Sequence, residues 1–491
     1  MTALSLALLV IPLGGAGIAL WCRPLRRAWA VSLATAAVEL ALAVWLAVRV
    51  QTDGAQSGLR GWLYLDSLGA LVLCLTALIG FIAILGARDY LGREIEEGHL
   101  HVADGAHFFP LTLAFLGTMV AVPLMNNLGL MWVAIEATTV VSALLVGISR
   151  SHAGLEAAWK YLMLASVGIA LALFGTMMTY YASRGVLGSS NSALQWTHLL
   201  AVARSLDPQV MRLAFVFVLV GYGTKAGLAP MHTWLPDAHS QAPSPVSGLL
   251  SGVLLNSSIY AILRFRALAV PAIGGGFVDH LLIGFGLMSI IVALPFLTVQ
   301  GDLKRLFAYS SVEHVGVIVL AVGIGGSVAL YAAVLHMVAH SLAKSGAFFS
   351  SGAIAQLLGT RRMGRIRGLT KSAPALALAL LASVLALGGF PPFAMFTSEF
   401  GLVLGAFDQG RGALGVVAAL LLALAFAALL FHTAGMVFGE PAPRREEHAA
   451  RPDLLIVASA AIPILLGIWL GIVPPGPIKD LIRDAAHILE V

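Results

Sequence analysis

The sequence predicts an all-α polytopic membrane protein with about 14 transmembrane helices. Of its 491 residues, 59% are hydrophobic and only 11% are charged, which is too few to cover the surface of a water-soluble chain of this length. Apolar runs of roughly 20 residues recur along the whole chain, and each is long enough for a helix to cross a hydrocarbon core roughly 30 Å thick. Helices are expected because strands would not carry continuous apolar runs of this length.

Each expected helix corresponds to one apolar run. The loops between the runs are short, and no linker rich in Ser, Pro or charge divides the chain, so residues 1–491 should form a single membrane domain. The expected spans are residues 3–21, 28–50, 64–86, 108–125, 127–148, 157–182, 210–230, 243–266, 278–300, 303–325, 328–356, 373–406, 412–438 and 453–473.

The distribution of basic residues predicts the orientation. The first run has no positive charge before it and three arginines after it, the reverse of a secretory signal. With the N-terminus outside, most of the basic residues fall on the cytoplasmic side, as the positive-inside rule requires, and both termini of this bacterial-type inner-membrane protein are external. The residues expected on the cytoplasmic side are Arg23, Arg26, Arg27, Arg88, Arg93, Arg150, Lys160, Lys304, Arg305, Arg361, Arg362, Arg365, Arg367, Lys371, Arg444, Arg445 and Arg451.

The composition also excludes several function classes. The net charge is only +5, and the basic residues lie in short clusters between apolar runs, which argues against nucleic acid as a partner. Two cysteines, Cys22 and Cys74, cannot hold a Cys-ligated iron–sulfur cluster or a Cys₄ zinc site, and the chain has no dinucleotide or P-loop fingerprint. We therefore expect no cofactor in this chain.

Ionisable residues inside the expected spans are the main functional signal. A charged group at bilayer depth costs several kcal/mol unless it is paired or hydrated, so such groups are usually functional. The ionisable residues inside the expected spans are Glu39, Glu136, Lys225, Glu313, His314, His336, His340, Lys344, Glu399 and His432. Of these, Glu39 and His432 are lone groups on outer spans, so we leave them out of the set of main candidates.

Glu136 and Lys225 are expected to work together. Glu136 lies midway along its span, and Lys225 lies where glycines and a proline loosen the helix, which is tolerated beside a cavity or inside protein. A buried Lys–Glu pair can change protonation when a neighbouring proton arrives. The alternatives are a structural salt bridge, or a neutral Glu136 hydrogen-bonded by Thr138, Thr139 or Ser142.

Two histidines and a lysine are predicted to line one helix face. His336, His340 and Lys344 follow one another at four-residue intervals, so they extend over about 12 Å of the same face. Histidine titrates near neutral pH and suits a proton relay, whereas a zinc site is not expected because no third ligand follows the pair. Glu313 and His314, also near mid-depth, are secondary candidates, with a hydrogen-bonded structural carboxyl as the alternative.

Two interrupted spans, the seventh and the twelfth, predict an internal repeat. The second interruption contains two glycines and two prolines and precedes Glu399. Because the interrupted spans lie five apart, spans 4–8 and 9–13 would run in opposite directions, as in an inverted repeat. Glu399 would then correspond to Lys225, and Glu313 to Glu136. Residues 1–107 would hold helices 1–3, residues 108–266 and 278–438 the two repeats, and residues 453–491 the last helix and the tail.

The order of these residues resembles the proton-translocating antiporter-like family shared by the membrane arm of respiratory complex I, the Mrp cation/proton antiporters and the membrane-bound hydrogenases. The most specific stretch is GTKAGLAPMHTWLPDAHSQAPSPVSGLLSG, from Gly223 to Gly252. The resemblance implies fourteen core helices with two inverted five-helix half-channels, and a Glu136–Lys225 pair. It also implies a connection through His336, His340 and Lys344 and a terminal ionisable group at Glu399.

One position departs from that family pattern. Asn256 stands near the place where many relatives have a further lysine, and asparagine cannot take up a proton. The link from Lys225 to the central axis would then need water, Ser257, Ser258 or His239, or this half-channel is impaired. Asn256 and the Glu313–His314 pair look most like the hydrogenase-4 component F branch of the family.

The resemblance implies a proton-translocating subunit of a redox-driven membrane complex, not catalytic by itself. Its expected partners are the lipid bilayer, other membrane subunits and a peripheral redox arm that holds iron–sulfur and, in a hydrogenase, nickel–iron centres. The expected cargo is the proton, with Na⁺ as the alternative. Two other functions stay open: an Mrp-type cation/proton antiporter subunit and a proton-inactive scaffold, although a scaffold would have no use for such costly buried charges.

Overall fold

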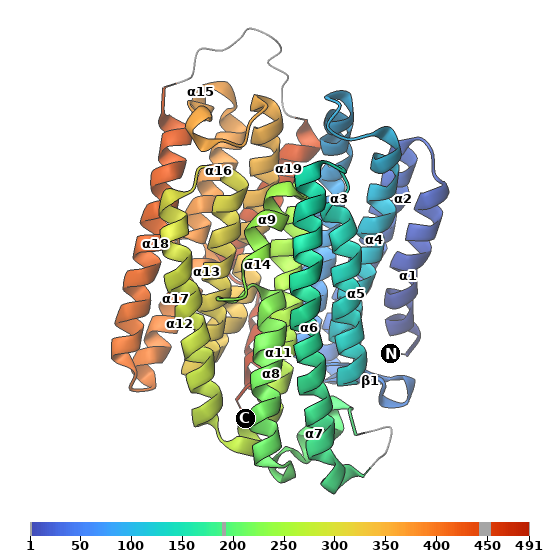
Figure 1. The fold of residues 1–491 in the computed structure, drawn as a ribbon, viewed down its shortest axis with the longest axis vertical. Coiled ribbons are helices and arrows are strands. Elements are labelled where there is room, and N and C mark those ends of the chain that lie inside the picture. The colour runs from blue at the N-terminus through green and yellow to red at the C-terminus, as the bar shows by residue number, and fades with distance from the viewer. Residues whose placement is uncertain (1, 189–192, 441–452, 491) are drawn as a thin grey trace.

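The computed structural model describes residues 2–188, 193–440 and 453–490, and these form a bundle of roughly parallel and antiparallel helices (Figure 1). Twelve of the helices in the described residues are long and apolar enough to cross a membrane, which confirms the all-α polytopic class. They are α1 (Thr2–Trp21), α2 (Leu25–Asp53), α3 (Ser67–Glu96), α4 (Val102–Leu124), α5 (Leu128–Val146), α6 (His152–Leu187), α10 with η3 and α11 (Ser244–Leu249, Leu250–Leu254 and Leu255–Ile273), α12 (Gly275–Val299), α13 (Leu303–Ile324), α14 (Gly326–Leu358), α18 (Gly412–Phe438) and α19 (Leu454–Ile472).

The seventh and twelfth predicted spans are interrupted helices, as the glycines and prolines in them suggest. The seventh comprises α8 (Pro208–Ala226) and α9 (Trp234–Gln241), and the twelfth comprises α16 (Pro374–Leu387) and α17 (Ala394–Asp408). Gly227 ends α8 in the left-handed conformation at φ +81°, which only glycine adopts without strain. The two breaks fall where the inverted repeat requires them, and the repeat itself stays a prediction.

Several short elements flank the long helices. A hairpin of β1 (Gln56–Gly58) and β2 (Leu63–Leu65) follows α2, and the long loop after α6 contains the short helix α7 (Trp196–Ala201). After α14 comes α15 (Leu369–Ser372), and after α19 the amphipathic helix α20 (Gly476–His487) packs against α3 and α14. The remaining short turns are η1 (Leu59–Gly61), η2 (Ala203–Ser205) and η4 (Met363–Arg365).

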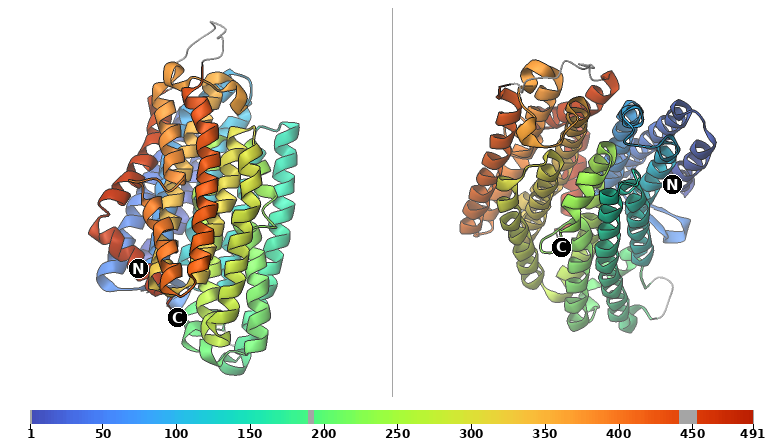
Figure 2. Two further views of the ribbon diagram at one scale, coloured as in Figure 1. Left: turned by 90° about the vertical axis from the view of Figure 1, so that its left-hand side faces the viewer. Right: turned by 45° about the horizontal axis from the view of Figure 1, so that its top comes forward.

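The bundle has two chemically different ends. At one end, ion pairs join Arg150 to Asp104 and Arg305 to Asp237, and they involve basic residues that the charge distribution placed on the cytoplasmic side. We call this the arginine-rich end; it is the upper end in Figure 1, where α15 lies. The opposite end carries β1, α7 and the chain ends marked N and C in Figures 1 and 2. Which end faces the cytoplasm stays a prediction.

Burial divides the helices into a centre and a periphery. All of the apolar span of α13 is buried, whereas only 33% of that of α12 is buried, so α13 lies inside the bundle and α12 at its edge. Arg305 is the one residue of α13 that is not buried. Polar side chains on α13 therefore face other helices, where protein groups can solvate them.

A buried ion pair holds the end opposite the arginine-rich end together. Asp66, which caps the first turn of α3, accepts two hydrogen bonds of 2.6 Å from the guanidinium group of Arg264 on α11. The same guanidinium lies 4.2 Å from the ring of Trp196 on α7 and 4.7 Å from that of Tyr260. This single contact joins three segments that are distant in the sequence.

We expect Asp66→Asn to destabilise the folded protein, because it leaves the buried Arg264 charge without a counter-charge at a cost of about 3–5 kcal/mol. The amide oxygen can still cap α3, so the effect should come from the ion pair. Thermal unfolding of the purified protein in detergent measures it. Asp53→Asn, which breaks the exposed Arg49 pair of α2, is the control. Equal unfolding temperatures for the two variants would contradict the assignment.

Candidate functional site

Lys225 lies in the last turn of α8, directly before the interruption, and its side chain is wholly buried. Its Nζ donates hydrogen bonds to Thr139 Oγ1 on α5 at 2.8 Å and to the hydroxyl of Tyr161 on α6 at 2.6 Å. Nζ also lies 4.9 Å from the centre of the Tyr161 ring. Hydroxyl groups and a ring face thus replace water around this ammonium group.

Glu136, half-buried on α5, is joined to Lys225 through a hydroxyl group. Thr139 Oγ1 donates to Glu136 Oε2 at 3.2 Å while it accepts from Lys225, and Ser166 on α6 donates to Glu136 Oε1 at 2.9 Å. No direct ion pair connects the lysine and the glutamate in the described residues. Thr139 is a bridge, so a change in the charge of Glu136 acts on Lys225 through one shared hydroxyl. We call Glu136, Thr139, Tyr161, Ser166 and Lys225 the first cluster.

Sequence reasoning named three hydroxyls for Glu136, and only one of them reaches it. Thr138 and Ser142 donate to backbone carbonyls of α5 instead, and the Ser142 hydroxyl lies 2.8 Å from that of Tyr161. Tyr161 and Ser166 were missed, since both come from α6. They lie five residues apart in the stretch 161–175 of α6, which is otherwise apolar, and this was the signal that could have identified them.

A second cluster forms where α14 meets α13. His336 and His340 are both buried on α14, and the ring centre of His314 on α13 lies 5.3 Å from that of His336. The rings of His314 and His336 are in hydrogen-bond contact at 3.2 Å, and the ring centres of His314 and His340 are 5.6 Å apart. His336 Nδ1 lies 3.0 Å from the hydroxyl of Ser398 on α17. His314 and Ser398 thus extend the predicted face of α14 onto two neighbouring helices.

Lys344 and Glu313 supply the charges of the second cluster. Lys344 is wholly buried, and its Nζ donates to the carbonyl oxygen of Phe307 at 2.9 Å. It lies within electrostatic range of Glu313, and Glu313 Oε2 lies 3.8 Å from His314 Nε2. One cation and one carboxyl therefore lie beside three imidazole rings.

Glu399 of α17 lies against the second helix interruption. A Cβ atom at Gly389, which has φ +61°, would overlap the Glu399 carboxyl group, so glycine makes room for it. Glu399 is also within electrostatic range of Glu313 on α13. The residue before it, Ser398, contacts His336, so α17 brings Glu399 close to the second cluster.

His239 and Asn256 occupy places that the sequence did not predict. His239 of α9 is wholly buried, stacks on Phe348 with ring centres 4.7 Å apart, and lies within electrostatic range of Lys344. Asn256 donates to Ser341 Oγ at 2.8 Å and to the carbonyl oxygen of Met337, so it ties α11 to α14. His239 therefore belongs to the second cluster.

The expected link from Lys225 to the central axis is not formed by direct contacts. Neither His239 nor Asn256 hydrogen-bonds with Lys225 in the described residues, and the Ser257 hydroxyl donates to the Val253 carbonyl. The two clusters are thus separate groups. The described residues also contain no group of three His, Cys, Asp or Glu side chains suited to hold a metal ion.

Comparison with known proteins places this arrangement in a family. The profile described as NADH:quinone oxidoreductase/Mrp antiporter, TM, matches residues 125–429, a region that contains both clusters. A hydrogenase-4 component F homolog from Methylacidiphilum infernorum is 43% identical over 376 residues, which cover 77% of this chain and 79% of that protein. NADH-quinone oxidoreductase subunit N from Desulforudis audaxviator is 31% identical over 431 residues, 86% of this chain and 82% of that protein.

The fold of the chain is also similar to that of a solved structure. A chain in the solved structure of the Mrp complex from a Dietzia species superimposes with a TM-score of 0.85 at 24% identity, covering 100% of this chain and 98% of that one. The sequence match extends through the interrupted helices and both clusters of buried ionisable residues. The chain therefore belongs to the NADH:quinone oxidoreductase/Mrp antiporter transmembrane family, and it is an antiporter-like membrane subunit.

Proposed function

We propose that this subunit translocates protons in a redox-driven membrane complex. The observation that carries the proposal is the pair of buried clusters in the middle of the bundle. Hydrogen bonds join the titratable side chains of the first cluster. Hydrogen-bond contacts and electrostatic interactions join those of the second cluster. Such groups cost free energy in a membrane, and they are usually retained there because they serve a pathway. Similarity to a hydrogenase-4 component and to a subunit of a quinone oxidoreductase supports coupling to redox chemistry.

In the first cluster, Glu136 controls the proton of Lys225. When Glu136 is ionised, its charge favours the ammonium form of Lys225 through the Thr139 bridge; when Glu136 is protonated or a neighbouring subunit draws its charge away, Lys225 releases its proton more readily. The interruption after Gly227 gives this proton a hydrated route, because backbone groups there are not used by a helix.

In the second cluster, protons pass along the imidazole rings toward α17. His314, His336 and Ser398 are in hydrogen-bond contact, so a proton can be handed from ring to ring and on toward Glu399 beside the second interruption. Glu399 is the terminal site. Electrostatic repulsion from Glu313 influences when Glu399 releases its proton, because two nearby carboxylates do not ionise independently.

The partners and the topology belong to the same proposal. The arginine-rich end faces the cytoplasm of a bacterial-type inner membrane, and both termini are external. Other membrane subunits and a peripheral redox arm complete the complex, and the iron–sulfur or nickel–iron centres lie in that arm. The fold similarity to an Mrp complex supports the alternative, a cation/proton antiporter subunit. Mass spectrometry of the purified native complex discriminates between the two, because redox subunits accompany the chain only in the first case.

Lys225→Ala should abolish proton translocation while the complex still assembles, because water can fill the space beside the interruption. The expected loss is about 10²–10⁴-fold, the range for removal of a positioned proton donor. Proton uptake by vesicles that contain the purified complex measures it. Lys160→Ala, which removes a half-exposed lysine of α6, is the matched control. Full translocation in an assembled Lys225→Ala complex would remove this lysine from the mechanism.

His340→Ala should slow proton transfer strongly and leave the metal content unchanged, because the three histidines act as a relay. His432→Ala, which changes a histidine at the bundle edge that contacts the Leu297 carbonyl, should have little effect. Proton flux and elemental analysis of both variants check the prediction. If His340→Ala loses one equivalent of zinc, the site is a metal site instead.

Glu399→Gln keeps shape and hydrogen bonding but removes titration, so it should block proton release as severely as Lys225→Ala. Asn256→Ala should lower the rate only modestly, since the loss is that of hydrogen bonds worth about 1–2 kcal/mol. Asn256→Lys should be tolerated better than lysine at apolar positions of the same helix. Proton translocation by reconstituted vesicles compares the variants, and an inactive Asn256→Ala beside an active Glu399→Gln would overturn the pathway.

A further inference from the structure

A largely apolar groove of about 660 Å³ lies on the outside of the bundle near the arginine-rich end. Its wall is built from the end of α1, the first half of α4, the end of α5 and the start of α6. Leu144 and Trp159 on this wall are each more than half exposed, so the groove opens toward the membrane. None of the described residues that line it belongs to either cluster.

The groove is polar at one end and apolar along the rest. Its ionisable lining residues, Asp104, His107 and Arg150, lie at the arginine-rich end, at the start of α4 and directly after α5. From there the wall continues inward through apolar residues as far as Ala114 on α4 and Leu162 on α6. A phospholipid has the same profile, with a charged headgroup at the interface and acyl chains in the hydrocarbon core.

Small side chains make the groove deep and narrow. Ala114, Ala143 and Ala158 line it, and it extends about 15 Å along α4 from Asp104 to Ala114 at 1.5 Å per residue. A volume of about 660 Å³ over that depth gives a mean cross-section of about 44 Å², whereas a helix roughly 10 Å across needs about 80 Å². The groove therefore has room for flexible chains but not for a helix of another subunit.

Arg150 supplies positive charge at the mouth of the groove. Its Nη2 lies 2.8 Å from Asp104 Oδ1, and its side chain is 70% exposed while that of Asp104 is 7% exposed. The carboxylate thus holds the guanidinium group from the inside and leaves other N–H groups accessible from the membrane interface. Arg23, Arg26 and Arg27 are also exposed and follow α1 at the same end, so the mouth carries a surplus of positive charge.

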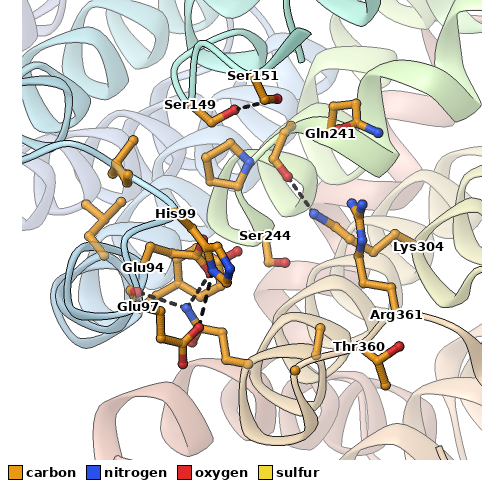
Figure 3. Close-up of a pocket in the computed structure, with 18 of the residues that line it drawn as sticks. Glu94, Glu97, His99, Ser149, Ser151, Gln241, Ser244, Lys304, Thr360 and Arg361 are labelled. Carbon is orange, nitrogen blue, oxygen red and sulfur yellow. Dashed lines mark hydrogen bonds and ion pairs between the residues drawn. The ribbon is translucent and has the colours of Figure 1, made fainter. Parts of the chain in front are cut away.

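The backbone at Arg150 has an unusual conformation that directs its side chain to the groove. Its φ of +51° lies in the left-handed region, which is unfavourable for a residue other than glycine. Ser149 and Ser151 line a separate polar cavity, where their hydroxyls are 3.3 Å apart, and Ser151 also caps α6 (Figure 3). The side chain of Arg150 points away from these serines, toward Asp104. Backbone strain of this kind is concentrated at binding sites.

We propose that this groove binds an anionic phospholipid from the leaflet at the arginine-rich end. The headgroup phosphate contacts Arg150 and His107, and the acyl chains lie along α4 and α6. The guanidinium group suits this role because its N–H groups match phosphate oxygens, and the exposed Trp159 near the start of α6 is typical of a membrane interface. The lipid also packs against α5 and α6, the helices that carry Glu136 and Tyr161. The site does not rest on the proposed function.

Binding of phosphatidylglycerol and phosphatidylcholine to the delipidated, purified complex tests the site, with native mass spectrometry as the measurement. We expect preference for phosphatidylglycerol, and Arg150→Gln should weaken its binding about tenfold through loss of a charged hydrogen-bond donor. Ala114→Phe, which leaves Arg150 in place and fills the apolar part, should weaken it at least as much. Arg49→Gln, which breaks an exposed arginine–aspartate pair at the opposite end, is the matched control and should bind normally.

Equal binding of the two lipids, or unchanged phosphatidylglycerol binding by either groove variant, would overturn the proposal. The position of the lipid is tested with phosphatidylglycerol that carries a photoreactive diazirine in an acyl chain. In the intact complex we expect labelling of residues 110–114 and 155–162, reduced by Arg150→Gln, and labelling confined to other segments would contradict the site. A p-benzoylphenylalanine in place of Leu162 that cross-links to another subunit would also contradict it, because the groove would then be a subunit contact.

Discussion

The cost of a charge in an apolar environment governs this structure. The side chains of Lys225 and Lys344 are wholly buried inside the bundle, so the protein must supply polar atoms in place of a full hydration shell. It does so with hydroxyl groups and backbone carbonyls: Thr139 and Tyr161 around Lys225, and the Phe307 carbonyl at Lys344. Helices that are buried on every side, such as α13, carry these groups because each of their faces meets another helix.

The two interrupted helices follow from the same constraint. An intact helix uses its own carbonyl and N–H groups, whereas a break releases some of them at mid-depth. Gly227 ends α8 beside Lys225, and Gly389 makes room for the Glu399 carboxyl group. Each break thus places a titratable side chain next to backbone that can be hydrated. Both breaks were predictable, because glycine and proline have local effects that do not depend on the partner helix.

Much of the site could be predicted from the sequence. The remaining part could not be predicted, because it depends on how the helices pack against one another. The four-residue spacing of His336, His340 and Lys344 determines their common face, since helix geometry alone sets it. The Thr139 bridge and the contact of Ser398 with His336 depend on which helices lie side by side and at what height. Span patterns do not contain that information. The pairing of Glu136 with Lys225 could therefore be predicted, but not the way in which side chains of other helices join them.

Lys304, at the start of α13, could not be distinguished from its neighbour for the same reason. In the sequence it stands beside Arg305 before an apolar run, and the positive-inside rule treats the two residues alike. In the structure Arg305 is outside and Lys304 is buried, because successive residues on a helix point about 100° apart and only one of these directions meets the α9–α10 junction.

Asn256 fits this separation of the two clusters. Its amide group donates hydrogen bonds to Ser341 Oγ, one helical turn from Lys344, and to the Met337 carbonyl oxygen. An asparagine at this position therefore holds α11 against α14, but its amide cannot carry a proton from one cluster to the other.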